Sequence, residues 1–284
     1  MTPTGRGLQP RLPRGARAAL TVEDVDLGGR RAERYRPAGT PRGTILWLHG
    51  GGFVTGSVGL ERRVAAARAM TSACDTYNLD YRLAPRYPFP AALDDAISAY
   101  RALLARGANP TTTLLSGGSA GAGLALSTML RLRDLGLPQP AGAVLLWPYA
   151  DFTFSGASIL HNADVDMLPL HELAAVWGPA YVGEADPTDP LVSPALADLT
   201  GLPPMLVLAG GAESLLSCAE HLAANAQRDG VDLRLSVYPE KVHGWLVLSK
   251  LPASLEAIAE IDAWIDRRLD PQLPTREVPI GDAP

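Results

Sequence analysis

The stretch LSGGSAGAGLAL at residues 115–126 decides how the rest of the chain is interpreted. It places Ser119 in a G-x-S-x-G pattern that follows an apolar run and precedes a helix-like run of Ala and Leu. Glycines on both sides of a serine permit a sharp strand-to-helix turn in close contact with neighbouring strands. Such a turn would hold the hydroxyl exposed at the carboxyl edge of a sheet, near a helix N-terminus that favours negative charge. The five letters alone fit an incidental serine in a glycine-rich turn about as well, but the strand-to-helix context favours an exposed functional serine.

Short apolar runs alternate with longer helical patterns along the chain. The first two strand candidates alternate polar and apolar residues, as half-exposed antiparallel strands do, whereas the later ones are nearly continuous Ile, Leu and Val, as in parallel strands covered on both faces. This order predicts an α/β fold with a mostly parallel eight-stranded sheet and helices on both faces. The strand candidates are residues 20–27, 31–37, 43–50, 74–82, 111–118, 142–149, 204–211 and 233–239. The helix candidates are residues 61–72, 90–106, 119–136, 214–229 and 254–269.

Residues 150–190 interrupt the alternation, because they contain no apolar strand and only one short helical pattern. A long insertion after a parallel strand usually lies over the carboxyl ends of the strands, where α/β proteins bind ligands. We expect this insertion to form a cap or substrate pocket on a core made of residues 21–149 and 191–270. Residues 1–20 are expected to form a loosely ordered arm or a reduced cap segment, and residues 271–284 a tail.

Composition narrows the function classes. The chain has 284 residues and a formal charge of −5, which argues against nucleic acid and anionic membranes as partners. No run approaches the roughly 18 apolar residues of a membrane-spanning helix, and the basic N-terminal region lacks the apolar core of a signal peptide. The two cysteines, Cys74 and Cys218, match no metal spacing, and so few thiols in so long a chain favour a reducing cytoplasm.

A serine hydroxyl is a weak nucleophile unless a base takes its proton, and the chain has five histidines. His243 lies just past the last predicted strand, where the fold would place a loop beside the other strand ends. His161 and His171 lie in the insertion and His221 lies within a predicted helix, so position along the chain favours His243. A lone histidine is more often structural than catalytic, so this assignment depends on its partners.

A carboxylate that orients the histidine would complete the set. Glu213 is the only acid in the turn after the apolar run 204–211, and Glu220 lies further along the predicted helix. The order Ser119, Glu213, His243 is the order in which α/β-hydrolases carry their nucleophile, acid and base. Taken alone, Glu213 fits equally well an ordinary acid at a helix N-terminus, stabilised by the helix dipole.

The stretch ILWLHGGGFVTGS at residues 45–57 supplies three consecutive glycines directly after a predicted strand. Consecutive glycines leave backbone N–H groups free to point at a ligand. The N–H groups of Gly51, Gly52 and Ala120 would then form an oxyanion hole. A phosphate-binding loop is the alternative, but this stretch matches neither G-x-x-x-x-G-K-[ST] nor G-x-G-x-x-G. His49 is interpreted as a structural hydrogen-bonding residue rather than a base.

Together these motifs resemble the hormone-sensitive lipase family of bacterial esterases, a branch of the α/β-hydrolases. The resemblance spans residues 44 to about 250 in the family's order. It rests most on H-G-G-G together with D-Y-R-L-A-P, because G-x-S-x-G alone is not specific. The matching stretches are HGGGFVTGS (49–57), DYRLAPRYPFPAALDD (80–95), GGSAGAGLAL (117–126), DPLVSP (189–194), GLPPMLVLAGGAESLLSCAEHL (201–222) and YPEKVHGW (238–245).

The resemblance implies an α/β-hydrolase fold and the hydrolysis of short to medium acyl esters through an acyl-enzyme, with no cofactor. It implies that Ser119 is the nucleophile, that His243 is the general base and then the acid, and that Glu213 orients it. The three N–H groups named above would hold the oxyanion. The resemblance further implies a cap that includes residues 150–190 and a homodimer formed through the sheet edge near the histidine.

The chain departs from the family pattern in three places. The elbow usually reads G-D-S-A-G, and Gly118 stands here in place of the acid, which removes a polar side chain beside the nucleophile. Most relatives use Asp where this chain has Glu213, and one group uses Glu. Only about 20 residues precede the first predicted strand, so the N-terminal half of the cap looks short and substrate size stays open.

Several residues beside the motifs are candidates for substrate contact. Phe53 and Gly118 adjoin the glycine-rich loop and the elbow, and Phe152, Met167 and Leu168 lie in the insertion. The insertion residues fit a small core of their own equally well, which is the commoner case.

Two other functions remain open at this point. A non-catalytic small-molecule binder on the same fold is disfavoured, because a pure binder has no use for a general base. Another acyl-transfer hydrolase, such as a lactonase or an amidase, would need the same serine, acid and histidine, so these residues do not separate it from an esterase. A dehydrogenase is disfavoured because the dinucleotide fingerprint is missing.

Overall fold

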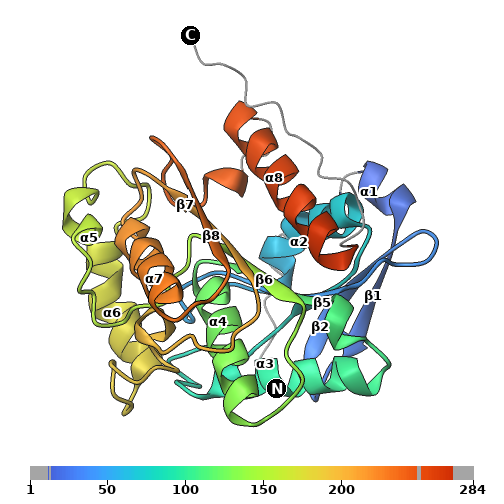
Figure 1. The fold of residues 1–284 in the computed structure, drawn as a ribbon, viewed down its shortest axis with the longest axis horizontal. Helices are drawn as coiled ribbons and strands as arrows, with labels where there is room; N and C mark the ends of the chain where they lie inside the picture. The colour runs from blue at the N-terminus through green and yellow to red at the C-terminus, as the bar shows by residue number, and fades with distance from the viewer. Residues whose placement is uncertain (1–11, 13, 248–250, 271–284) are drawn as a thin grey trace.

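The computed structural model describes residues 12, 14–247 and 251–270 of the chain. Eight strands form one sheet in the order β1-β2-β4-β3-β5-β6-β7-β8 (Figure 1). The first two strands pair antiparallel, β2 also pairs antiparallel with β4, and every other pair is parallel. The predicted mostly parallel eight-stranded sheet is confirmed. The strands are β1 (Leu20–Asp26), β2 (Arg31–Pro37), β3 (Thr44–Leu48), β4 (Asp75–Leu79), β5 (Thr113–Gly118), β6 (Gly142–Leu146), β7 (Met205–Gly210) and β8 (Leu233–Tyr238).

Helices cover both faces of the sheet, as Figure 1 shows. One face carries α3 (Ala91–Ala105), α4 (Ala120–Asp134) and α7 (Leu216–Arg228), and the other carries α2 (Val58–Ser72) and α8 (Pro252–Leu269). Short 3-10 turns follow at η1 (Pro110–Thr112), η2 (Pro194–Leu196) and η3 (Trp245–Val247). Among the described residues, none of the helices is both long enough and apolar enough to cross a membrane.

Strands β3, β6 and β7 are apolar at nearly every position because their side chains enter two separate cores. In β3, Leu46 and Leu48 pack in the core under α3 and α4, while Ile45 and Trp47 pack in the core under α2 and α8. Successive side chains of a strand point to opposite faces, so a strand covered on both sides loses the polar alternation of an edge strand.

Part of the expected N-terminal arm is ordered against the core. Residues 14–19 form the helix α1 (Arg14–Ala19), which contacts α2 and β1. Its Ala16 is buried in the core under α2 and α8. The remainder of the predicted arm, residues 1–11 and 13, and the predicted tail 271–284 lie outside the described residues.

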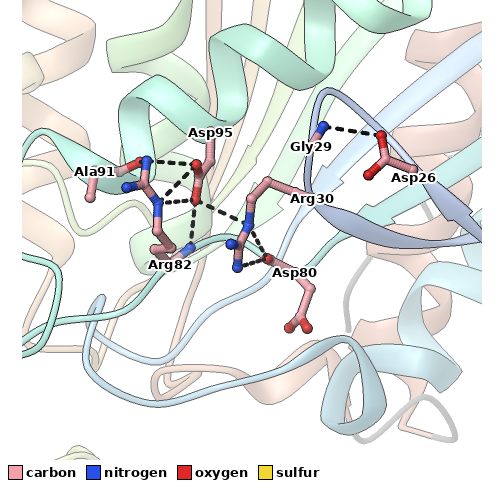
Figure 2. Close-up of polar contacts among 7 residues, drawn as sticks. All are labelled: Asp26, Gly29, Arg30, Asp80, Arg82, Ala91 and Asp95. Carbon is pink, nitrogen blue, oxygen red and sulfur yellow. Dashed lines mark hydrogen bonds and ion pairs between the residues drawn. The ribbon is translucent and has the colours of Figure 1, made fainter.

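The D-Y-R-L-A-P motif holds a partly buried ion pair that ties the loop after β4 to α3. Asp95 is 5% exposed and accepts hydrogen bonds from the guanidinium of Arg82 at 2.8–3.0 Å and from its main-chain N–H at 2.8 Å. Arg30, from the turn between β1 and β2, lies 3.4 Å from the same carboxylate and donates to the carbonyl of Asp80 (Figure 2). The motif therefore fastens three segments far apart in sequence, which is a structural role.

The insertion forms two helices, α5 (Ser158–His161) and α6 (Leu170–Val182). The shorter helix packs against α7 and α6. In Figure 1 both lie beside α7, at the end of the sheet to which β7 and β8 belong. One short helical pattern was expected in this stretch; the structure contains α6 and, in addition, α5, which is only a single turn.

Candidate active site

Ser119 lies between β5 and α4 in a strained turn. Its φ and ψ are 54° and −120°, a left-handed conformation that non-glycine residues rarely adopt unless the surroundings hold them there. The main chain is held on both sides: the Ser119 N–H donates to Leu146 O at 2.9 Å, and the Ser119 carbonyl accepts from Tyr149 N at 3.1 Å. The side chain is only half-buried. The sequence thus builds a rigid turn that presents a hydroxyl.

The glycines of this turn are required by close approach to β3. A Cβ added at Gly121 would lie 1.9 Å from the carbonyl oxygen of Leu48, and one at Gly117 would lie 2.5 Å from the same atom. No side chain fits at such distances, because the neighbouring atoms are backbone. The glycines of the G-x-S-x-G pattern therefore allow the turn to lie directly against β3, the strand that precedes the glycine-rich loop.

Glu213 and His243 meet at the ends of β7 and β8. Glu213 Oε2 lies 3.0 Å from His243 Nδ1, and Oε1 accepts a hydrogen bond from the Gly210 N–H at 3.0 Å. Glu213 is fully buried, and this desolvation raises the pKa of its carboxyl, against the opposing effect of its hydrogen bond with His243. A carboxylate beside Nδ1 favours the tautomer with hydrogen on Nδ1, which leaves Nε2 free to accept a proton.

The ring of His243 is packed against a tryptophan that sequence reasoning missed. Trp147, directly after β6, makes an edge contact with the imidazole, with ring centroids 6.1 Å apart. The same indole fills the space beside Gly118, where an added Cβ would lie 3.1 Å from Trp147 Nε1. Trp147 thus occupies the space beside the elbow where the usual family sequence places an acid.

The glycine-rich loop after β3 lies beside the elbow. A Cβ added at Gly50 would lie 3.6 Å from Ser119 Cβ. The Gly50 N–H donates to Glu61 Oε1 at 2.7 Å, and Glu61 Oε2 accepts from the indole of Trp47 at 2.8 Å. Glu61 was not singled out from the sequence, because an acid in the first turn of α2 resembles an ordinary helix N-terminal residue.

The next two glycines leave their N–H groups unused. Gly51 and Gly52 have φ values of 119° and 60°, which a side chain rarely permits. Among the described residues, neither N–H donates a hydrogen bond. Ala120 is the first residue of α4, where a backbone N–H has no acceptor within its own helix. Three donors are therefore available where the loop adjoins the helix N-terminus.

The insertion packs directly on this loop through one face of α6. An added Cβ at Gly52 would lie 2.2 Å from the ring of Trp177, and Tyr181 stacks on Phe53 with ring centroids 3.8 Å apart. Residues 177 and 181 are four apart and so lie on the same side of the helix. The insertion therefore covers the glycine-rich loop.

His49 is a buried structural residue in this arrangement. Its ring stacks on Tyr81 with centroids 4.1 Å apart, and Nδ1 lies 2.8 Å from the Gly50 carbonyl. Burial lowers the pKa of His49, which keeps the ring neutral.

The residues predicted to contact substrate are spread over different environments. Phe53 is buried in an aromatic cluster with Tyr181 and Phe152. Phe152 also lines a pocket of about 670 Å³ whose lining residues all lie between 152 and 187. Met167 is 66% exposed, and Leu168 packs against the core under α3 and α4. Neither residue lines that pocket.

Comparison with known proteins agrees with this geometry. The alpha/beta hydrolase fold family matches residues 45–247. An acetyl-hydrolase of Streptomyces hygroscopicus is 40% identical over 222 residues, covering 78% of this chain and 74% of its own. An esterase of Acinetobacter venetianus is 32% identical over 244 residues, covering 85% of this chain and 80% of its own.

Solved structures give the same family. A hormone-sensitive lipase from a metagenome library superposes with a TM-score of 0.87 at 39% identity, covering 91% of this chain and 87% of that one. An esterase from the bacterial hormone-sensitive lipase family superposes with a TM-score of 0.85 at 38% identity, covering 88% and 85%. The chain belongs to the α/β-hydrolases, in the bacterial hormone-sensitive lipase family.

Proposed function

We propose that the chain hydrolyses carboxylic esters of short to medium acyl length through an acyl-enzyme on Ser119. The observation that carries the proposal is the distance of 3.0 Å between the buried Glu213 carboxylate and His243 Nδ1. These two residues follow β7 and β8, which come later in the chain than the strained turn at Ser119. The names of the esterases and acetyl-hydrolase to which the chain is similar support the same reaction class.

The reaction begins when the ester carbonyl lies between Ser119 and the glycine-rich loop. His243 Nε2 takes the hydroxyl proton as Oγ forms a bond to the carbonyl carbon, and the carbonyl oxygen becomes an oxyanion. The imidazolium then gives that proton to the departing alcohol, which leaves an acyl group on Ser119. A water repeats the sequence with the same base, which releases the acid and restores the serine.

Glu213 is proposed to act by charge and orientation. It accepts a hydrogen bond from His243 Nδ1–H, which keeps Nε2 directed away from the acid, and it stabilises the imidazolium formed in each half of the reaction. It stays ionised throughout, so it moves no proton itself.

The N–H groups of Gly51, Gly52 and Ala120 are proposed to hold the oxyanion. Removal of one such donor costs about 3–4 kcal/mol of transition-state stabilisation in comparable sites. Backbone donors fixed by the glycine-rich loop and the helix N-terminus need no reorganisation when charge develops, which is why the loop has to be rigid.

The insertion is proposed to accommodate the acyl chain through its aromatic and aliphatic side chains. Phe152 and Tyr181 lie in ring contact with Phe53, next to the proposed oxyanion donors. Apolar side chains of this kind favour the binding of alkyl groups. The size of the space that the insertion encloses then sets the longest acyl chain that can bind.

The test is the hydrolysis of p-nitrophenyl esters from acetate to palmitate by the wild type, Ser119→Ala and Ser98→Ala. Ser98 is an exposed serine on α3 and serves as the matched control. We expect short esters to be hydrolysed by the wild type and the control, and the activity to vanish in Ser119→Ala with folding unchanged. Equal activity in Ser119→Ala would exclude this nucleophile.

We also infer a homodimer through the edge strand β8, which among the described strands pairs only with β7. Its Val237 is 42% exposed, so Val237→Asp is expected to weaken the dimer. Light scattering at micromolar concentrations tests this, and a wild-type monomer would contradict it.

A cytoplasmic location is likewise proposed, supported by two cysteines that are both free and buried.

A further inference from the structure

The insertion reaches both loops that carry Glu213 and His243, through the single carboxylate of Asp166. Asp166 Oδ1 accepts a hydrogen bond from the main-chain N–H of His243 at 2.9 Å. Its Oδ2 accepts one from the main-chain N–H of Ser214 at 2.7 Å. The carboxylate therefore bridges the residue after the proposed acid and the proposed base itself.

A second side chain from the same turn acts on the acid loop. Asn162 Nδ2 donates to the carbonyl of Glu213 at 2.9 Å. The Asp166 N–H donates to the Asn162 carbonyl at 2.9 Å, so the two residues belong to one closed turn between α5 and α6. The turn thus contacts the acid loop through a donor and an acceptor, and the base loop through an acceptor.

These bonds lie further along both loops than the main-chain hydrogen bonds that join the loops directly. The Gly211 N–H donates to Tyr238 O at 2.8 Å and the Ala212 N–H donates to Lys241 O at 3.0 Å, which joins the loops where they leave the strands. Asp166 joins them two residues further out, at the positions of the acid and the base. Hydrogen bonds to an ionised carboxylate are shorter and about twice as strong as neutral ones, so this link restrains both loops.

We propose that Asp166 is a positioning residue that sets the geometry between Glu213 and His243. The inference rests on the proposed function, because it assigns Asp166 to the support of that same pair. It makes the insertion part of the catalytic framework: the segment that covers the glycine-rich loop also holds the acid and the base in register. Among the described residues, the Asp166 carboxylate accepts hydrogen bonds from these loops only through main-chain N–H groups, so it positions the acid and the base through the main chain. Desolvation raises the pKa of the Glu213 carboxyl, and the charge of Asp166 lies near enough to raise it further.

The experiment compares Asp166→Ala, Asp166→Asn and Asp164→Ala in the full chain. Asp164 lies two residues earlier in the same turn, is exposed and accepts no hydrogen bond from the described residues, so its variant removes the same charge without the bridge. Intact sites are counted by end-point labelling of Ser119 with an organophosphonate, and kcat for p-nitrophenyl acetate is expressed per labelled site.

Asp166→Ala is expected to lower kcat per labelled site by roughly ten- to a hundredfold, because small misplacements of catalytic groups have effects of this order. Asp166→Asn keeps one acceptor and turns an amide toward the other N–H, so a smaller loss is expected. Asp164→Ala should match the wild type. The low-field proton resonance of His243 Nδ1–H should shift or broaden in Asp166→Ala only.

A purely stabilising residue would behave differently. In that case Asp166→Ala would have fewer labelled sites and a lower melting temperature, while kcat per remaining site and the Nδ1–H resonance stayed at wild-type values. That result would overturn the inference. A wild type without Ser119-dependent hydrolysis would overturn the proposed function instead, so the two failures are distinguishable.

Discussion

Replacing Glu213 by Gln tests the proposed acid at one atom pair. The substitution keeps the shape of the side chain and removes its charge. The carboxylate now serves two partners, His243 Nδ1 on one oxygen and the Gly210 N–H on the other. A glutamine has one oxygen and one NH₂, so it can accept from only one of these donors.

The expected loss follows from the separation of the charges. Glu213 Oε2 and His243 Nδ1 are 3.0 Å apart, and at an effective dielectric constant of about 20 the attraction between carboxylate and imidazolium is roughly 5.5 kcal/mol. At about 1.4 kcal/mol per factor of ten, this corresponds to a fall in kcat of around 10⁴-fold. The acid-to-amide change in a well-studied serine protease triad has an effect of about the same size.

The assay is kcat for p-nitrophenyl acetate, corrected for intact sites, with Glu220→Gln as the control. Glu220 is an exposed acid on α7 seven positions further along, and its replacement should leave kcat unchanged. A loss smaller than about tenfold in Glu213→Gln would refute the assignment of the acid, because it would leave less than roughly 1.4 kcal/mol for the pair.

Stability should respond differently from activity. Burial raises the pKa of Glu213, so its contribution to stability is greatest below the carboxyl's ordinary pKa and is lost as the pH rises through the folded value. A glutamine does not ionise and loses nothing over that range, although it gives up one hydrogen bond of about 1 kcal/mol. We expect the melting temperature at neutral pH to change by about 4 °C or less.

Three further predictions address other parts of the site. Gly121→Ala places a Cβ 1.9 Å from a β3 carbonyl, so urea unfolding should show a loss of about 3 kcal/mol, and wild-type stability would contradict the close approach. Asp95→Ala leaves the half-buried Arg82 without its carboxylate and should cost about 2–3 kcal/mol, with kcat per labelled site unchanged. Trp177→Ala removes the ring that covers Gly52, so the p-nitrophenyl ester series should shift toward bulkier acyl groups, and a profile identical to the wild type would show that this ring does not limit the substrate.

The sheet and its order of helices were predictable because each strand carries its own signal. The run 45–48 is apolar at successive positions because alternate residues enter two cores, and that pattern is visible without a structure. The Glu213–His243 contact was predictable for a topological reason: both residues follow strands that lie next to each other and run parallel, so their loops leave the same edge.

Asp166 and Trp147 could not be found in this way. Asp166 contacts His243 across 77 residues of sequence, and a polar residue in an irregular segment carries no periodicity that distinguishes it from a solvent-facing one. Trp147 follows a buried strand, where an aromatic residue is ordinarily core. Met167, the neighbour of Asp166, was predicted to contact substrate; its side chain is largely exposed, and this role stays a prediction.

The contacts of the insertion bear on how substrate selectivity can change in this chain. On one side α6 packs Trp177 and Tyr181 on the loop that supplies the proposed oxyanion donors, and on the other side the turn at Asp166 holds the acid and base loops. A displacement of the insertion as a unit therefore moves supports of both halves of the proposed catalytic site. Substitutions that only reshape its apolar lining should alter KM, whereas those that shift the segment as a whole should lower kcat as well.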